Sequence, residues 1–170
     1  MKKEYFTYNP SQTKKLAEIL AKKILKIRPK NKAFIIGLEG DLGGGKTTFL
    51  QGFAKGLGIK EKILSPTFVI FKKFKITKRK NKKQKIKSPL FAHSKNAKMQ
   101  KFKNFYHVDC YRIRGSKEIL NLGFKEIISN PENIVAIEWA EHIKKIIPKG
   151  AFWIKFKFID KNIRKIKIMC

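Results

Sequence analysis

The sequence predicts a single α/β domain in which a central, mostly parallel sheet is flanked by helices and extended by antiparallel strands. Short apolar stretches of strand length alternate along the chain with amphipathic stretches of helical spacing. One of the apolar stretches, Ile134–Ile137, has no polar residue, which is typical of a strand buried on both faces of a parallel sheet. A length of 170 residues suits one domain, 1–170, with an ordinary hydrophobic core.

The first half of the chain supplies strands and helices in alternation. Glu4–Tyr8 is predicted as an edge strand, and the next helix, Pro10–Leu25, begins at a proline and carries apolar residues at three-to-four spacing. The apolar run Ala33–Leu38 has the character of a buried strand, and Thr47–Ala54 continues from it as a helix. Thr67–Phe71 is predicted as a further strand because it follows a proline and is rich in β-branched and aromatic residues.

The second half continues the pattern and ends in a hairpin. Phe105–Asp109 is expected to pair with the preceding strand, and two short helices are expected at Lys117–Leu122 and Phe124–Ser129. Aromatic and lysine residues alternate in Phe152–Phe158, which predicts a half-buried strand, and Ile163–Met169 is expected to return beside it.

The charge of the chain is extreme, with 41 Lys and Arg against 12 Asp and Glu, a formal net charge of +29. Such a field attracts polyanions, so contact with nucleic acid is one explanation. AT-rich coding, which enriches Lys, Ile, Asn and Phe together, is an equally good one. The densest run lies within Thr77–Lys103, a segment with little apolar periodicity, which we interpret as a flexible Lys-rich insertion.

Several classes of protein are disfavoured by the sequence. No apolar run approaches the roughly 20 residues of a membrane span, and the basic start is not followed by the apolar core of a signal peptide. Cys110 and Cys170 have no metal-ligand or redox spacing. We therefore expect a cytoplasmic protein that does not bind a membrane.

The stretch Gly40–Thr47 matches G-x-x-x-x-G-K-[ST] at every fixed position and lies between an apolar strand and a helix. Glycines permit positive φ angles, so successive backbone amides can surround a phosphate at the start of the helix. Lys46 would reach the β- and γ-phosphates, and the Thr47 hydroxyl would complete the coordination of Mg²⁺. The alternative, a glycine-rich turn with a solvated lysine, is much weaker given these flanks. The motif indicates a P-loop NTPase-like domain that binds a nucleotide.

Glu138 and Trp139 follow the apolar strand Ile134–Ile137. Ligands of open α/β sheets bind outside the carboxyl ends of the strands, so Glu138 is expected beside the glycine loop, where it could act on Mg²⁺ or on water. A surface carboxylate is the less favoured interpretation. For Trp139, a core anchor and an adenine-stacking residue are equally good interpretations.

Five ordered blocks resemble the TsaE family, formerly called YjeE, over nearly the whole chain. The blocks are Gly40–Phe49, Ser65–Phe68, His107–Arg112, Leu122–Glu126 and Ile137–Ala140. The resemblance implies a small bacterial P-loop ATPase needed to make threonylcarbamoyladenosine beside the anticodon of tRNAs. In that family the ATPase, which uses ATP and Mg²⁺, does not transfer the group itself. It binds the TsaD–TsaB complex, which does, and its nucleotide cycle is thought to reset that complex.

The resemblance also implies roles for single residues. Lys46 would hold phosphate with the loop backbone, Thr47 and Glu138 would hold Mg²⁺, and Asp109 would be an acidic residue needed for hydrolysis. Trp139 and the first-helix region near Thr13 would flank adenine, and Thr67 would belong to a switch-like loop. The remaining phosphate-binding positions are Gly43, Gly44, Gly45 and Thr48. We interpret His107 as packed or hydrogen-bonded, and Tyr111 and Arg112 as bracing the site or facing a partner.

Three features depart from the family pattern. Gly44 stands where alanine is usual, which should loosen the loop without removing a donor. Cys110 replaces an aliphatic residue, and the Lys-rich insertion replaces a much shorter connection. Two other functions stay open: a P-loop small-molecule kinase, which would need a second substrate pocket, and a nucleic-acid-binding module, which would explain the charge but not the loop. Direct contact with tRNA is compatible with the basic surface.

Overall fold

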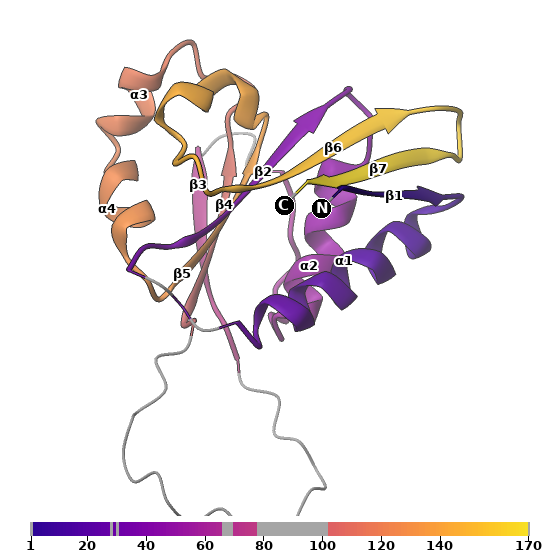
Figure 1. The fold of residues 1–170 in the computed structure, drawn as a ribbon, viewed down its shortest axis with the longest axis horizontal. Helices are drawn as coiled ribbons and strands as arrows, with labels where there is room; N and C mark the ends of the chain where they lie inside the picture. The colour runs from indigo at the N-terminus through magenta and orange to yellow at the C-terminus, as the bar shows by residue number, and fades with distance from the viewer. Residues whose placement is uncertain (1, 28, 30, 66–69, 78–101, 170) are drawn as a thin grey trace, which may run out of the picture.

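The computed structural model describes residues 2–27, 29, 31–65, 70–77 and 102–169, and it confirms the α/β prediction. One seven-stranded sheet runs through the molecule with helices on both faces (Figure 1). The strands are β1 (Lys2–Thr7), β2 (Phe34–Gly40), β3 (Phe71–Lys75), β4 (Asn104–Asp109), β5 (Asn133–Glu138), β6 (Phe152–Phe158) and β7 (Arg164–Met169). The helices are α1 (Pro10–Ile24), α2 (Lys46–Gly56), α3 (Ser116–Leu120), α4 (Phe124–Ser129) and the 3₁₀ helix η1 (Ala140–Ile146).

The strand order, β1-β7-β6-β2-β5-β4-β3, puts four parallel strands in the middle of the sheet. Strands β6, β2, β5 and β4 run parallel to one another. Strands β7 and β3 pair antiparallel with β6 and β4 at the two sides, and β1 pairs antiparallel with β7. The predicted edge strand and the C-terminal hairpin are thereby confirmed, and β1 begins beside the end of β7 (Figure 1). The carboxyl ends of β2, β5 and β4 meet at one edge. That edge is where α/β sheets bind ligands.

Two predictions of local structure need correction. The strand placed at Thr67–Phe71 begins at Phe71 and continues to Lys75; residues 66–69 lie outside the described part of the chain, and Ile70 is in a bend. Three of the five residues of β3 are lysines, so its sequence has no clear strand periodicity. Backbone hydrogen bonds to β4 nevertheless hold it in the sheet. The 3₁₀ helix η1 was not predicted, because it lacks the 3.6-residue period of an α-helix and is interrupted at Ile143, where φ is −119°.

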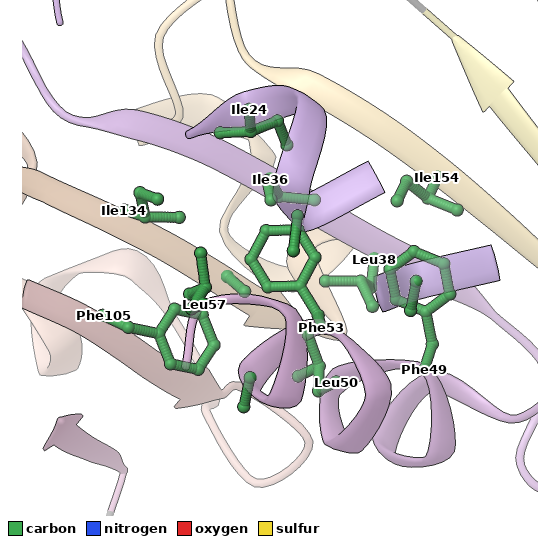
Figure 2. Packing of buried hydrophobic residues seen from close by; sticks show 14 of the residues in the cluster. Ile24, Ile36, Leu38, Phe49, Leu50, Phe53, Leu57, Phe105, Ile134 and Ile154 are labelled. Atoms are coloured by element: carbon green, nitrogen blue, oxygen red, sulfur yellow. The ribbon is translucent and has the colours of Figure 1, made fainter. Parts of the chain in front are cut away.

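The hydrophobic core forms two layers, one on each face of the sheet. The first lies under α1 and α2, where Phe49, Leu50 and Phe53 of α2 point towards Ile36 and Leu38 of β2 (Figure 2). The second lies under α3, α4 and η1. Because the aromatic face of α2 is fully buried, the start of this helix is held firmly at the end of β2. No helix in the described ranges is long and apolar enough to cross a bilayer.

The last two residues of the predicted insertion belong to the folded domain, Phe102 through its buried ring and Lys103 through its backbone. Phe102 is 7% exposed and its ring lies edge-on to Phe34, with the centroids 6.3 Å apart. The amide of Ile76 donates to the carbonyl oxygen of Lys103 over 2.9 Å, and the Lys103 amide donates to Glu132. The predicted segment 77–103 is therefore too long at its end, because a single buried phenylalanine gives no periodicity. Residues 78–101 lie outside the described part of the chain.

Candidate nucleotide site

A cleft of about 600 Å³ opens at the carboxyl ends of β2, β4 and β5. Its walls come from the glycine loop, the first residues of α2, and the residues that end β4 and β5. The structure brings together nine of the residues predicted for the site: Gly43, Gly44, Gly45, Lys46, Thr47, Thr48, Asp109, Glu138 and Trp139. They come from three separate segments of the sequence. The sheet topology is what places them around one space.

The glycine loop adopts a backbone conformation that strongly favours glycine. Gly43 and Gly45 have φ angles of 71° and 95°, in the left-handed region. A Cβ atom at Gly44 would lie 2.8 Å from the carbonyl oxygen of Asp41, so alanine at this position would force the loop to move. Gly45 is also the N-cap of α2. The result is a turn without side chains at the N-terminus of a helix, a shape that fits an anion.

The turn between β6 and β7 braces this loop from outside. The Phe158 amide donates to the Asp41 carboxylate over 3.0 Å, and Nε of Arg164 donates to the carbonyl oxygen of Gly43 over 2.8 Å. The same guanidinium donates through Nη1 to the carbonyl oxygens of Asp160 and Ile163. Arg164 thus ties the glycine loop to the hairpin turn. This connection fixes the Gly43 carbonyl and, through it, the neighbouring peptide planes.

Lys46 is held inside the site and is only 5% exposed. Its Nζ donates to the carbonyl oxygens of Gly40 and Asp41, over 2.7 and 2.8 Å, and lies 3.6 Å from the ring centroid of Trp139. Burial lowers the pKa of Lys46, and the nearby carboxylates, Glu138 first among them, partly oppose that shift. An ammonium in this position would be stabilised by an added phosphate, whose negative charge would offset the loss of hydration that burial causes.

The Glu138 carboxylate is 2% exposed and is the centre of a buried polar cluster. Thr47 Oγ1 lies 3.0 and 2.9 Å from its two oxygens and donates to them. Nε2 of His107 lies 2.8 Å from Oε1. Our interpretation of His107 as a hydrogen-bonded, packed histidine is confirmed, but its partner is the predicted metal residue.

Asp109 ends β4 directly opposite Glu138 at the end of β5. Its Oδ2 accepts a hydrogen bond from the Ser65 hydroxyl over 2.6 Å, and its Oδ1 accepts from the Tyr111 amide over 3.0 Å. Both oxygens of Asp109 are thus oriented, and the side chain lines the cleft beside Glu138. A second carboxylate next to the phosphate loop could orient a water molecule.

Trp139 lines the cleft, whereas Thr13 does not. Trp139 has a φ angle of 58°, a left-handed conformation that non-glycine residues seldom adopt, and its ring lies 5.0 Å from that of Tyr111. Thr13 is 2% exposed and its hydroxyl is hydrogen-bonded to that of Thr7, between α1 and β1. The structure therefore gives no support to Thr13 as an adenine contact, because its side chain is occupied and lies apart from the cleft.

The donor set fits Mg²⁺ bound together with a nucleotide better than a metal held by protein alone. Within the described part of the chain no group of three or more His, Cys, Asp or Glu side chains is arranged around a common point. The oxygens of Thr47 and Glu138 are hard ligands of the kind that Mg²⁺ prefers, and this ion commonly takes its other ligands from phosphates and water.

Comparison with known proteins identifies the family. The sequence model described as threonylcarbamoyl adenosine biosynthesis protein TsaE matches residues 7–81 and 75–166. The chain belongs to the TsaE family. TsaE of Bacillus subtilis is 31% identical over 160 residues, which cover 94% of this chain and 80% of that protein. TsaE of Rickettsia prowazekii is 33% identical over 158 residues, covering 92% and 88%.

A solved structure agrees with this assignment. The crystal structure of YdiB from Bacillus subtilis aligns with a TM-score of 0.68 and 27% identity, and the alignment covers 99% of this chain and 84% of YdiB. The relatives are named as tRNA threonylcarbamoyladenosine biosynthesis proteins. The two matches to the TsaE sequence model overlap at residues 75–81, around the start of the Lys-rich segment.

Sequence reasoning missed the contact of His107 with Glu138 and the contact of Arg164 with the glycine loop. The role of His107 could have been inferred, because it precedes Asp109 by two positions on a strand and therefore lies on the same face. Arg164 carries no such signal, because it is one of 41 Lys and Arg residues and reaches the glycine loop only through the pairing of β6 with β7.

Proposed function

We propose that this TsaE-family protein is a Mg²⁺-dependent ATP-binding and weakly ATP-hydrolysing protein required for threonylcarbamoyladenosine modification of tRNA next to the anticodon. The observation that carries the proposal is the contact between α2 and β5, in which the Thr47 hydroxyl donates to the Glu138 carboxylate beside the buried Lys46. In this proposal the glycine loop binds phosphate, Thr47 and Glu138 bind the metal, and Lys46 supplies a positive charge. Phosphoryl transfer needs these three groups around one cleft.

Each residue of the cleft has a defined task in this proposal. The Gly43–Gly45 backbone and the N-terminus of α2 bind the phosphates, and Lys46 places its charge against the β- and γ-phosphoryl oxygens. Thr47 and Glu138 hold Mg²⁺, which when bound neutralises charge on those oxygens. Asp109 orients the attacking water from the end of β4. Trp139 offers an aromatic face at the side of the cleft for the nucleotide base.

We propose further that the protein acts on the TsaD–TsaB complex, which performs the transfer, and that it is an accessory ATPase in the cytoplasm. The family membership and the names of the relatives support the place in the pathway. The partnership with TsaD and TsaB follows from the family resemblance. Reconstitution of tRNA modification from purified TsaD–TsaB, tRNA and the threonylcarbamoyl donor, with and without this protein, tests it directly.

Nucleotide binding is tested with Lys46→Ala in titration calorimetry with Mg²⁺·ATP. Loss of a cation at a phosphate should weaken binding by about 2 kcal/mol or more, roughly thirtyfold. Lys55→Ala is the matched control, because Lys55 lies on the same helix but interacts with Glu18. Equal affinity of Lys46→Ala and the parent protein would refute the phosphate site. Transfer of the γ-phosphate of ATP to a small molecule instead of water would favour the alternative function, a P-loop small-molecule kinase.

A further inference from the structure

His107 lies on the face of β4 that points towards α2 and the glutamate of the site. In the parallel pairing of β4 with β5, His107 is opposite Ala136 and Asp109 is opposite Glu138. Side chains two positions apart on a strand share a face, so His107 and Asp109 are on one side of β4. The alanine opposite His107 is small. It leaves room for the imidazole to reach the next side chain on the same face of β5, which is Glu138.

The contact is short and isolated from water. Nε2 of His107 lies 2.8 Å from Oε1 of Glu138, and the side chains of the two residues are 1% and 3% exposed. The other ring nitrogen, Nδ1, is buried and has no hydrogen-bond partner within the part of the chain that the structure describes. A carboxylate only accepts hydrogen bonds, so the ionised Glu138 accepts the hydrogen bond that Nε2 donates.

The unpartnered nitrogen argues against a purely structural role. An unsatisfied buried polar atom costs free energy, and an apolar side chain of similar size would fill this place in the core without that cost. The hydrogen bond to Glu138 is therefore the feature that a histidine supplies here and an apolar residue would not. That contact restricts the rotation of a carboxylate whose two oxygens also accept from Thr47.

We propose that His107 is a positioning residue that holds the Glu138 carboxylate in the orientation needed to bind Mg²⁺ beside Thr47. This inference rests on the proposed function, in which Glu138 and Thr47 hold the ion. Residues that hydrogen-bond to metal ligands commonly change metal affinity or activity by about 10- to 100-fold when replaced. His107 does not line the cleft, so in this proposal it acts only through Glu138.

Two amide substitutions separate positioning from packing. In His107→Gln the side-chain amide nitrogen occupies roughly the place of Nε2 and can still donate to Glu138, whereas in His107→Asn it occupies roughly the place of Nδ1 and falls short. His107→Leu keeps the volume without a donor. For each variant, the affinity for a non-hydrolysable ATP analogue is measured by calorimetry with Mg²⁺ and again with EDTA. Thermal unfolding by circular dichroism identifies any variant that does not fold.

The ratio of the two affinities measures the contribution of the metal. We expect the ratio to fall about tenfold or more in the Asn and Leu variants and to stay within about threefold of the parent in the Gln variant. The affinity in EDTA should be the same in all four proteins. If the Asn variant does not fold, the comparison of the Leu variant with the Gln variant tests the same point.

Two results would overturn the inference while leaving the proposed function intact. One is a parent-like ratio in the Asn and Leu variants, and the other is a Gln variant as impaired as the Leu variant. A parent protein that binds the analogue no better with Mg²⁺ than with EDTA would instead reject the metal site of Thr47 and Glu138, and with it the positioning role.

Discussion

Nε of Arg164 lies 2.8 Å from the carbonyl oxygen of Gly43 and donates to it, so the first residue of β7 is fastened to the glycine loop. The two residues are far apart in the sequence and meet only because β6 pairs with both β2 and β7. A loop that binds phosphate with its backbone needs its carbonyl groups held away from the anion. Arg164 does this for Gly43, whose peptide planes turn easily because glycine has no Cβ atom.

Replacement of Arg164 by Met is therefore expected to weaken phosphate binding without unfolding the protein. Loss of a charge-assisted hydrogen bond to the loop should cost about 1 to 2 kcal/mol of nucleotide affinity, a five- to thirtyfold change. Calorimetry with Mg²⁺·ADP measures it. Arg114→Met is the control for loss of one positive charge, because Arg114 is exposed and lies outside the cleft. Equal weakening by both substitutions would mean that only the net charge matters.

The two carboxylates at the strand ends are expected to affect hydrolysis more than binding. Asp109→Asn and Glu138→Gln should keep most of the nucleotide affinity measured in EDTA and lose about 100-fold or more in phosphate release, because both act on water or metal. Phosphate release and analogue affinity are measured on the same samples. Glu126→Gln, an exposed change on α4, is the control. Hydrolysis at the parent rate in both cleft variants would remove these roles.

How far the sequence predicts the site depends on whether a residue acts through local pattern or through long-range pairing. Lys46 and Thr47 lie in a contiguous motif whose backbone shape follows from its glycines, and Glu138 directly follows the apolar run Ile134–Ile137. Local pattern places all three at one edge of the sheet, and all three line the cleft. Thr13 was placed there by family resemblance alone. Its hydroxyl instead forms a hydrogen bond with that of Thr7, six residues earlier in the chain, between β1 and α1.

The fold was predictable where local pattern defines an element, and the prediction failed where contacts between distant segments define it. The buried strand β5 and the helix α2 are recognisable from composition and periodicity. The predicted position of strand β3 was displaced because Lys72, Lys73 and Lys75 obscure the pattern, and only the ladder with β4 defines it. The burial of Phe102 likewise depends on Phe34, which is distant in the sequence.

Cys110 is expected to resist alkylation in the folded protein. Burial, aided by the charge of Asp109, raises the pKa of the Cys110 thiol from an ordinary value of 9.0 to about 12. The thiolate is the reactive form, so in a Cys170→Ser variant iodoacetamide should label Cys110 slowly at about pH 8.5 until guanidinium unfolds the chain. Labelling as fast in the native as in the unfolded protein, measured by mass spectrometry, would contradict the burial of this residue.

The same shift sets the sign of one contribution to the pH dependence of stability. Below about pH 9 the thiol is protonated in both states, and this contribution is fully present. Between about pH 9 and 12 only the unfolded chain releases the proton, so the free energy of unfolding should fall as the pH rises. A Cys110→Ala variant should lack this part of the alkaline loss. Equilibrium unfolding on either side of the ordinary thiol pKa, at about pH 8 and about pH 10, checks the sign in both proteins.

The Lys-rich segment gives the last prediction, and the structure fixes where it should be cut. The amide of Ile76 donates to the carbonyl oxygen of Lys103, so the chain enters and leaves the segment at adjacent points. Replacing residues 78–101 by a short Gly-Ser linker should therefore leave the fold and ATP affinity unchanged, since loop length alone costs little free energy. Removing 77–103 should cost about 3 kcal/mol of stability, because it also deletes the buried Phe102.

The shorter deletion also tests whether the segment contacts tRNA, because residues 78–101 are rich in Lys and Arg and contain no Asp or Glu. If they contact the RNA backbone, deletion should weaken tRNA binding and reduce the slope of log K against log[salt] by roughly 0.7 to 0.9 for each lost phosphate contact. Fluorescence anisotropy over a salt series measures both. Unchanged affinity and slope would mean that the lysines of this segment reflect AT-rich coding and not contact with RNA. Loss of ATP binding in this variant would show that the segment belongs to the nucleotide-binding core.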